Sequence, residues 1–299
     1  MANSITTFKK YIDLIDDVYK ENAKTAILDG DNSLVQAGSN AHEIVIPKIS
    51  MDGLGDYSRN GGYVDGDVTV TNETVEFNYD RGRAFTVDAM DNEETAGVAF
   101  GKLAGEFIRV KVVPELDAFR FAKYAGISGI SKVAAGATLS TGADVIAALR
   151  AGTTKMDEDE VPAEDRHLFL TPTLYGLVQD MDTTKSREVM SRFADITLVP
   201  QSRFYTAITL YDGKTDTSSQ DSGVNQKPGG FVKASAAKDI NFMIIHKPAI
   251  LQYTKHTVTK VITPEENQNA DAWKFPYRAY GLADVYENKV AGIYLHHKA

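Results

Sequence analysis

Two short motifs have residue types that enzymes use, and each departs from the pattern that its chemistry requires. Residues 97–102 place glycines before a lysine, as a phosphate-binding loop does. That loop needs four residues between its first glycine and the Gly-Lys pair, followed by serine or threonine; here three residues intervene and Leu103 follows. Gly126-Ile-Ser-Gly129 lacks the Gly-x-Ser-x-Gly spacing of a nucleophile elbow. Neither segment predicts a catalytic residue.

Candidate metal ligands do not form a pattern either. The chain has six histidines and no cysteine. His296 and His297 are adjacent, so on a strand they would point in opposite directions. The Asp-Gly pair at 29–30 begins like a calcium loop, but Leu34 stands where the glycine belongs and no glutamate closes the loop. We therefore predict no catalytic residue, no metal site and no cofactor, and we attribute the Asp-Gly pairs to turns.

Composition narrows the class of protein further. The chain has 299 residues, 43% of them apolar, which is enough for a sizeable core in one elaborated domain or two. A net charge of −9 argues against a surface that grips nucleic-acid phosphates. The chain has no run of 18 apolar residues, so the sequence predicts no membrane-spanning helix. The absence of cysteine removes disulfides and fits a reducing cytoplasm.

The segment 43–90 predicts an extended arm without a core of its own. Residues 43–49 have the pattern of a short strand, and Asp-Gly and Asn-Gly pairs then mark turns up to residue 67. Beyond them, apolar residues alternate with polar ones. Either Asn72-Glu73 is a two-residue hairpin turn, or residues 67–80 form one long strand with a bulge. Because large apolar side chains are few here, the arm must lie on something else, and a neighbouring subunit is the natural support.

Charged residues gather where this arm ends, and we predict that they make ion pairs between subunits. The alternative is that they are solvated charges on one subunit. With an arginine from the turn-rich part of the arm, the candidate contact residues are Arg59, Asp80, Arg81, Arg83, Asp88 and Asp91.

One helix is predicted before the arm and one after it. Residues 5–22 have an amphipathic helical pattern. Residues 92–125 predict a helix too long for a compact domain, with carboxylates in its first turn. Pro114 lies inside this pattern, so the helix either kinks there or restarts with Pro114 at its first position.

The second half of the chain predicts an α/β region at 137–247. A helix is expected near 141–155 and a short buried strand at 168–170, after which Thr171-Pro172 starts another helix. Strands are expected at 196–199, 206–210 and 240–246, with a polar excursion at 212–230. Residues 252–298 return to strand patterns.

The order of these elements, with particular segments, resembles the major capsid proteins of tailed bacteriophages. The resemblance rests on residues 44–50, 53–63, 79–95, 112–126, 168–178 and 239–256. It implies an α+β fold of the Hong Kong 97 type. In that fold 1–42 would be an N-terminal arm, 43–90 an extended β loop, 91–135 a peripheral domain with a spine helix, 136–247 an α/β axial domain, and 248–299 the peripheral-domain sheet.

The resemblance also implies a function. The chain would assemble with itself, as hexamers and pentamers, into the icosahedral head of a virion built in the cytoplasm of a host bacterium. A separate scaffold protein, a portal and decoration proteins would be its partners, with packaged double-stranded DNA nearby and no membrane. Two alternatives remain open: an encapsulin-like compartment shell, and a soluble α/β enzyme centred on residues 137–247.

Overall fold

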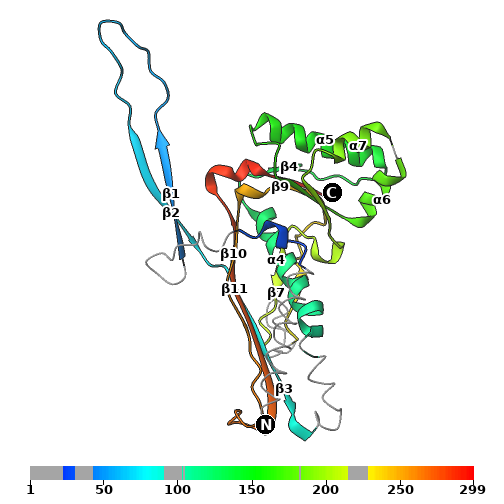
Figure 1. Ribbon diagram of the computed structural model, residues 1–299. Coiled ribbons are helices and arrows are strands. Elements are labelled where there is room, and N and C mark those ends of the chain that lie inside the picture. The colour runs from blue at the N-terminus through cyan, green and yellow to red at the C-terminus, as the bar shows by residue number, and fades with distance from the viewer. Residues whose placement is uncertain (1–22, 31–42, 91–102, 104, 182, 215–227) are drawn as a thin grey trace.

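A computed structural model describes residues 23–30, 43–90, 103, 105–181, 183–214 and 228–299. The strands are β1 (Glu43–Met51), β2 (Val68–Glu76), β3 (Tyr79–Asp88), β4 (Ser131–Lys132), β5 (Arg166–Leu170), β6 (Asp195–Leu198), β7 (Ile208–Leu210), β8 (Phe231–Lys233), β9 (Ile240–His246), β10 (Ile250–Thr259), β11 (Ala272–Val285) and β12 (Ile293–His297). The helices are α4 (Val113–Gly126), α5 (Gly142–Glu158), α6 (Pro172–Met181) and α7 (Thr184–Met190), with short helical turns η1 (Ala26–Leu28), η3 (Ile108–Val112), η4 (Gln201–Arg203), η5 (Lys247–Ala249) and η6 (Glu287–Gly292). Figure 1 shows a projecting hairpin, a long sheet beside α4, and an α/β region above it.

A five-stranded sheet forms the centre of the α/β region, in the order β4-β12-β9-β5-β6. Its central strands β9 and β5 are buried at every residue, as the continuous apolar run at 240–246 predicts for β9. Alternate residues face opposite sides. Leu168, Phe242 and Ile244 pack toward α5 and α6, whereas Phe169 and Met243 pack toward α4. This sheet therefore joins the helical layer to the rest of the chain.

The helices over this sheet begin where the sequence predicts. Thr141 accepts a hydrogen bond from the Asp144 amide at the start of α5, which forms a capping box. Pro172 is the first residue of α6. The helix α7 and the strands β3 and β8 were not predicted from the sequence.

The second sheet, in the order β10-β11-β3, runs beside α4. Tyr79 and Phe275 are buried against the helix together with Val113 and Leu116. No helix in the described part of the chain is long and apolar enough to cross a membrane.

The helix passes Pro114 by widening its preceding turn. Residues 105–107 are helical, η3 is a π-helical turn, and the Val113 amide bonds to the Ile108 carbonyl five residues back. A wider turn leaves room for the proline ring, which lies in the first turn of α4. The helix therefore continues through a π-helical turn into α4, which begins at Val113, and does not restart with Pro114 at its first position. The predicted helix at 5–22 and the predicted helix start near residue 92 lie outside the described residues.

The strands β1 and β2 pair antiparallel without a bulge, from Glu43 opposite Glu76 to Met51 opposite Val68. The proposed turn at Asn72-Glu73 is therefore wrong, because both residues lie inside β2. Neither residue is a glycine that would favour a tight hairpin turn. The long-strand alternative is correct up to Glu76, and the hairpin turns through residues 52–67 instead.

Candidate assembly surface

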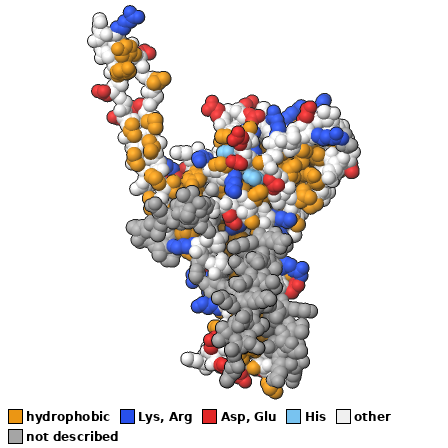
Figure 2. Space-filling view, in the orientation of Figure 1, with side chains coloured by type: hydrophobic (Ala, Val, Ile, Leu, Met, Phe, Trp, Pro, Cys, Tyr) orange, Lys and Arg blue, Asp and Glu red, His pale blue; other side chains and the backbone are white. Residues whose placement is uncertain are grey.

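The β1–β2 hairpin carries exposed apolar side chains on one face of its outer half. Ile49 lies opposite Val70 and Met51 opposite Val68, and directly opposed residues share a face of a sheet. Their exposed fractions are 61%, 63%, 69% and 67%. Figure 2 shows this apolar colouring along the projecting hairpin. We refer to these four residues as the hairpin apolar face.

The opposite face of the same strands is polar. Ser50 lies opposite Thr69, and Lys48 lies opposite Thr71. Lys48 Nζ is 3.0 Å from a Glu73 carboxylate oxygen and also pairs with Glu287 of η6, and the carboxylates raise the pKa of Lys48 above its usual range. At its base the hairpin packs Ile44 and Val75 against Leu251, Tyr253 and Leu282 of the second sheet. The hairpin is thus anchored at its base, and its outer half has one apolar and one polar face.

The tip of the hairpin is ordered by a tight turn. Ser58 and Gly62 exchange two backbone hydrogen bonds of 3.2 and 2.8 Å, and Gly62 has a positive φ of 77° that favours glycine. The rings of Tyr57 and Tyr63 lie 5.0 Å apart on either side. Arg59, a predicted contact residue, lies in this turn and is exposed.

Arg81 makes its described contacts within its own chain. Its Nε lies 2.7 Å from Glu115 Oε1 on α4, and its Nη1 donates to the Tyr211 carbonyl at 2.7 Å. Its Nη2 donates to the Gly230 carbonyl at 3.4 Å. Arg83 Nη1 donates to the Pro228 carbonyl at 3.0 Å. These arginines connect β3 to the two ends of the excursion between β7 and β8.

The aspartates Asp80 and Asp88 make hydrogen bonds to other groups. Asp80 accepts two bonds from Arg278, of 2.8 and 2.6 Å, because strand alternation turns Asp80 away from Arg81. Asp88 Oδ1 accepts from the Met90 amide at 2.9 Å. Asp91 lies outside the described residues. The structure therefore brings the arginines together on one face of β3, places Asp80 and Asp88 on the other, and leaves Arg59 at the hairpin tip.

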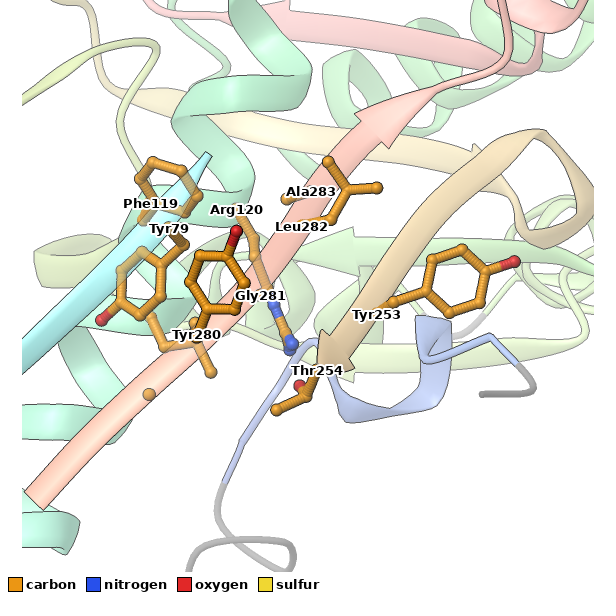
Figure 3. Close-up of a pocket in the computed structure, with 11 residues that line it drawn as sticks. Tyr79, Phe119, Arg120, Tyr253, Thr254, Tyr280, Gly281, Leu282 and Ala283 are labelled. Carbon is orange, nitrogen blue, oxygen red and sulfur yellow. The ribbon is translucent and has the colours of Figure 1, made fainter. Parts of the chain in front are cut away.

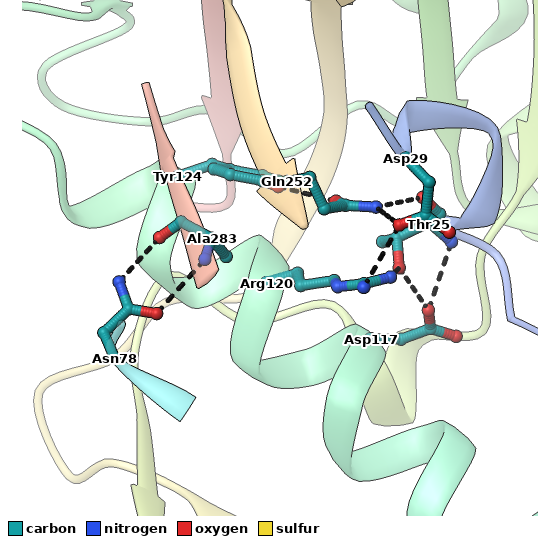
Figure 4. Close-up of polar contacts among 8 residues, drawn as sticks. All are labelled: Thr25, Asp29, Asn78, Asp117, Arg120, Tyr124, Gln252 and Ala283. Carbon is teal, nitrogen blue, oxygen red and sulfur yellow. Dashed lines mark hydrogen bonds and ion pairs between the residues drawn. The ribbon is translucent and has the colours of Figure 1, made fainter. Parts of the chain in front are cut away.

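The residues that sequence reasoning missed form a buried polar network around α4 (Figure 4). Asp117, Arg120 and Gln252 are 0%, 3% and 0% exposed. Asp117, Arg120 and Tyr124 recur at helical spacing, so a polar stripe on a buried helix was the available signal. The network holds residues 23–30 in place.

One hollow, drawn in Figure 3, lies between α4 and the second sheet, lined by aromatic rings and Arg120. Its volume open to water, about 10 Å³, is that of a single water molecule. Among the described residues no group of three or more His, Asp or Glu side chains is placed to hold a metal.

The C-terminal histidines have separate structural surroundings. His296 is buried, stacks on Phe242 with ring centroids 4.9 Å apart, and accepts at Nδ1 from Asn241 Nδ2 at 3.0 Å. Burial, assisted by the charge of His297, lowers the pKa of His296 to about 4. His297 Nδ1 instead lies 2.7 Å from the Lys298 carbonyl.

No protein-family model matches the chain, and no curated protein matches its sequence. Solved structures do match. A structure from Gordonia phage Cozz has a TM-score of 0.58 at 13% identity, covering 93% of this chain and 87% of that one. The capsid of cyanophage P-SCSP1u has a TM-score of 0.56 at 14% identity, covering 91% and 86%. A virus-like particle from Pyrococcus furiosus has a TM-score of 0.57 at 9% identity, covering 97% and 99%.

These matches confirm the fold predicted from the sequence. The chain has the α+β fold of the major capsid proteins of tailed bacteriophages, the Hong Kong 97 fold. Several of the phage structures that match, including that of cyanophage P-SCSP1u, are structures of capsids.

Proposed function

We propose that this chain is a major capsid protein, which assembles as hexamers and pentamers into the icosahedral head that encloses the double-stranded DNA of a tailed phage. The observation that carries the proposal is the hairpin apolar face. Four apolar side chains lie exposed side by side on an arm that projects from a capsid fold. Exposed contiguous apolar surface marks interaction sites. In a closed shell, a neighbouring copy of the chain would cover this face.

The same proposal assigns roles to the parts of the chain. Residues 1–42 serve as the N-terminal arm, 43–90 as the extended loop, 91–135 and 248–299 as the peripheral domain, and 136–247 as the axial domain. The contact residues predicted from the sequence, Arg59 above all because it lies exposed at the tip, would face neighbouring subunits. A separate scaffold protein, a portal and decoration proteins complete the set of partners, and the shell forms in the cytoplasm of the host.

The proposed role is structural and requires no catalysis. The net charge of −9 supports it, because a shell wall with a net negative charge repels packaged DNA and does not bind it through counterion release. DNA then lies near the shell without being gripped by it.

An encapsulin-like compartment is the second candidate. The virus-like particle from Pyrococcus furiosus matches over nearly the full length of both chains. Nucleic-acid content separates the two candidates: a phage head purified from infected cells contains DNA, whereas a compartment contains protein cargo.

Deletion of residues 52–66 tests the hairpin's role directly. This removes the tip but leaves both strands and the anchored base. We expect a subunit with the circular dichroism of the full chain that does not form closed shells in electron micrographs. Normal particles from this variant would refute a role for the tip, residues 52–66, in linking subunits; the hairpin apolar face, which the deletion keeps, is tested by substitution below.

A further inference from the structure

Residues 23–30 pack into a groove formed by α4 and β10, with Thr25 and Leu28 0% and 1% exposed. Figure 4 shows Thr25 and Asp29 of this segment beside Asp117, Arg120 and Gln252. The side chains that make hydrogen bonds to the segment come from residues between 91 and 227 positions further along the chain. The segment is thus bound as a peptide would be, by side chains of a surface that folds from other parts of the sequence.

Asp117 recognises the backbone and the hydroxyl at Thr25. Its carboxylate accepts from the amides of Lys24 and Thr25 at 3.1 Å each, and from Thr25 Oγ1 at 2.8 Å. Arg203 lies 3.2 Å from the same carboxylate and balances its charge. Because Asp117 is fully buried, losing these donors would leave a carboxylate without adequate partners.

Gln252 makes hydrogen bonds to the other side of the segment. Its Nε2 donates to the Thr25 carbonyl and to Asp29 Oδ1, both at 2.7 Å, and its backbone carbonyl accepts from the Gly30 amide at 2.9 Å. The hydroxyl of Tyr124 donates to Gln252 Oε1 at 2.6 Å and fixes the orientation of the amide. Burial raises the pKa of Tyr124, so this donor stays protonated.

Two further residues make the recognition specific to sequence. Leu28 is 1% exposed and enters the core cluster formed by α4 and β9. At Gly30 a Cβ would lie 2.7 Å from the Tyr253 ring, so a larger residue does not fit. The groove therefore selects threonine, then leucine three residues later, then aspartate and glycine.

We propose that this groove is a peptide-recognition site for the sequence of residues 23–30, and that it accepts this segment from a second copy of the chain as well as from its own. Twelve residues, 31–42, separate the segment from β1, and a stretch of that length spans at most about 40 Å. Exchange of an identical element is a low-cost route to joining subunits. The second copy is the one that the proposed function supplies, but recognition of the peptide does not depend on shell formation.

Peptide binding by the full-length chain tests the recognition. The double variant Thr25→Val and Gly30→Val weakens the chain's own segment and leaves the groove intact. A fluorescent peptide with the sequence of residues 22–31 should bind it saturably, at least about 10-fold more tightly than it binds the wild-type chain, whose own segment competes at millimolar effective concentration. A peptide of scrambled sequence should bind at least 10-fold more weakly. Equal binding of both peptides, or no binding by the folded variant, would overturn the proposal.

Complementation between two variants tests the exchange. Gln252→Leu impairs the groove and keeps the segment, so a mixture with the double variant has one good groove and one good segment on different chains. We expect a mixed complex on native mass spectrometry that neither variant forms alone at the same concentration. If both variants remain folded and no mixed complex appears, the segment is not exchanged. Because neither readout counts shells, failure here is separate from failure of the proposed function.

Discussion

Replacing one of the two opposed pairs of the hairpin apolar face, Ile49 and Val70, should impair assembly without unfolding the subunit. The variant is Ile49→Thr with Val70→Thr. Threonine keeps the β-branched side chain that suits a strand, so the change removes apolar surface and little else. Both positions are more than 60% exposed in the single chain, and surface substitutions of this kind change stability by about 0.5 kcal/mol or less.

The expected loss at the interface follows from the exposed fractions. Fully burying an isoleucine or valine side chain contributes about 1.5–3 kcal/mol. Since 61% and 63% of these side chains remain to be buried, each contributes about 1–2 kcal/mol on docking. Because threonine keeps one methyl group at each position, the double change removes part of this and weakens each hairpin contact by about 1–3 kcal/mol, or about 5- to 140-fold in its equilibrium constant.

The assay measures light scattering over a range of protein concentrations, to find the concentration at which particles first appear. Each subunit brings one hairpin, so the concentration at which particles first appear should rise by a factor of that size. The matched control is Ser50→Ala with Thr71→Ala, two changes on the polar face of the same strands, which should leave this concentration unchanged. Thermal unfolding of the unassembled subunits should be similar for all three proteins.

Two results would refute this reasoning. If the apolar-face variant assembles at the wild-type concentration, the hairpin does not dock by that face. If the control variant fails equally, the hairpin's overall stability matters and not the chemistry of one face.

Three further predictions concern the stability of the subunit. Gly152→Val on α5, where a Cβ would lie 2.8 Å from a tyrosine ring of β12, should destabilise the fold by about 1–3 kcal/mol through overpacking; the matched change Gly176→Ala on α6, which meets nothing within 4 Å, should instead stabilise by about 0.5–1 kcal/mol, both measured by denaturant unfolding. Arg166→Met should cost about 2–4 kcal/mol in the same measurement, because a side chain 4% exposed loses its 2.7 Å ion pair with Asp157 and two strong bonds to carbonyls. The pKa of His296 falls from its unfolded value of 6.5 to about 4 in the fold, so the unfolded chain binds more protons and stability should fall as pH drops from about 6.5 toward 4; His296→Gln should flatten this dependence, and an unchanged slope would contradict the assignment.

The parts of the fold that local sequence determines could be predicted. The continuous apolar run of β9 defines a strand buried on both faces. Thr171-Pro172 marks the start of α6 because threonine caps and proline suits the first turn. The glycine and aspartate content of residues 52–67 predicts a turn-rich segment that does not form a core.

The parts of the fold that depend on pairing between distant segments could not be predicted from the sequence. The local sequence allowed a turn at Asn72-Glu73, and the pairing of β1 with β2 excludes it. No local feature of the sequence specifies the register of that pairing. Arg81 was grouped with the aspartates beside it, whereas its partner Glu115 comes from a helix packed across the sheet. The segment at 23–30 has an ordinary sequence, and only the groove reveals why Thr25 is buried.

The most direct test of the central claim is electron microscopy, with light scattering, of the purified full-length chain over a range of concentrations and with candidate scaffold proteins added. The account predicts closed shells of uniform size, with a sharp concentration threshold and few intermediates. A chain that stays a monodisperse monomer under all these conditions, with the hairpin exposed and intact, would contradict it.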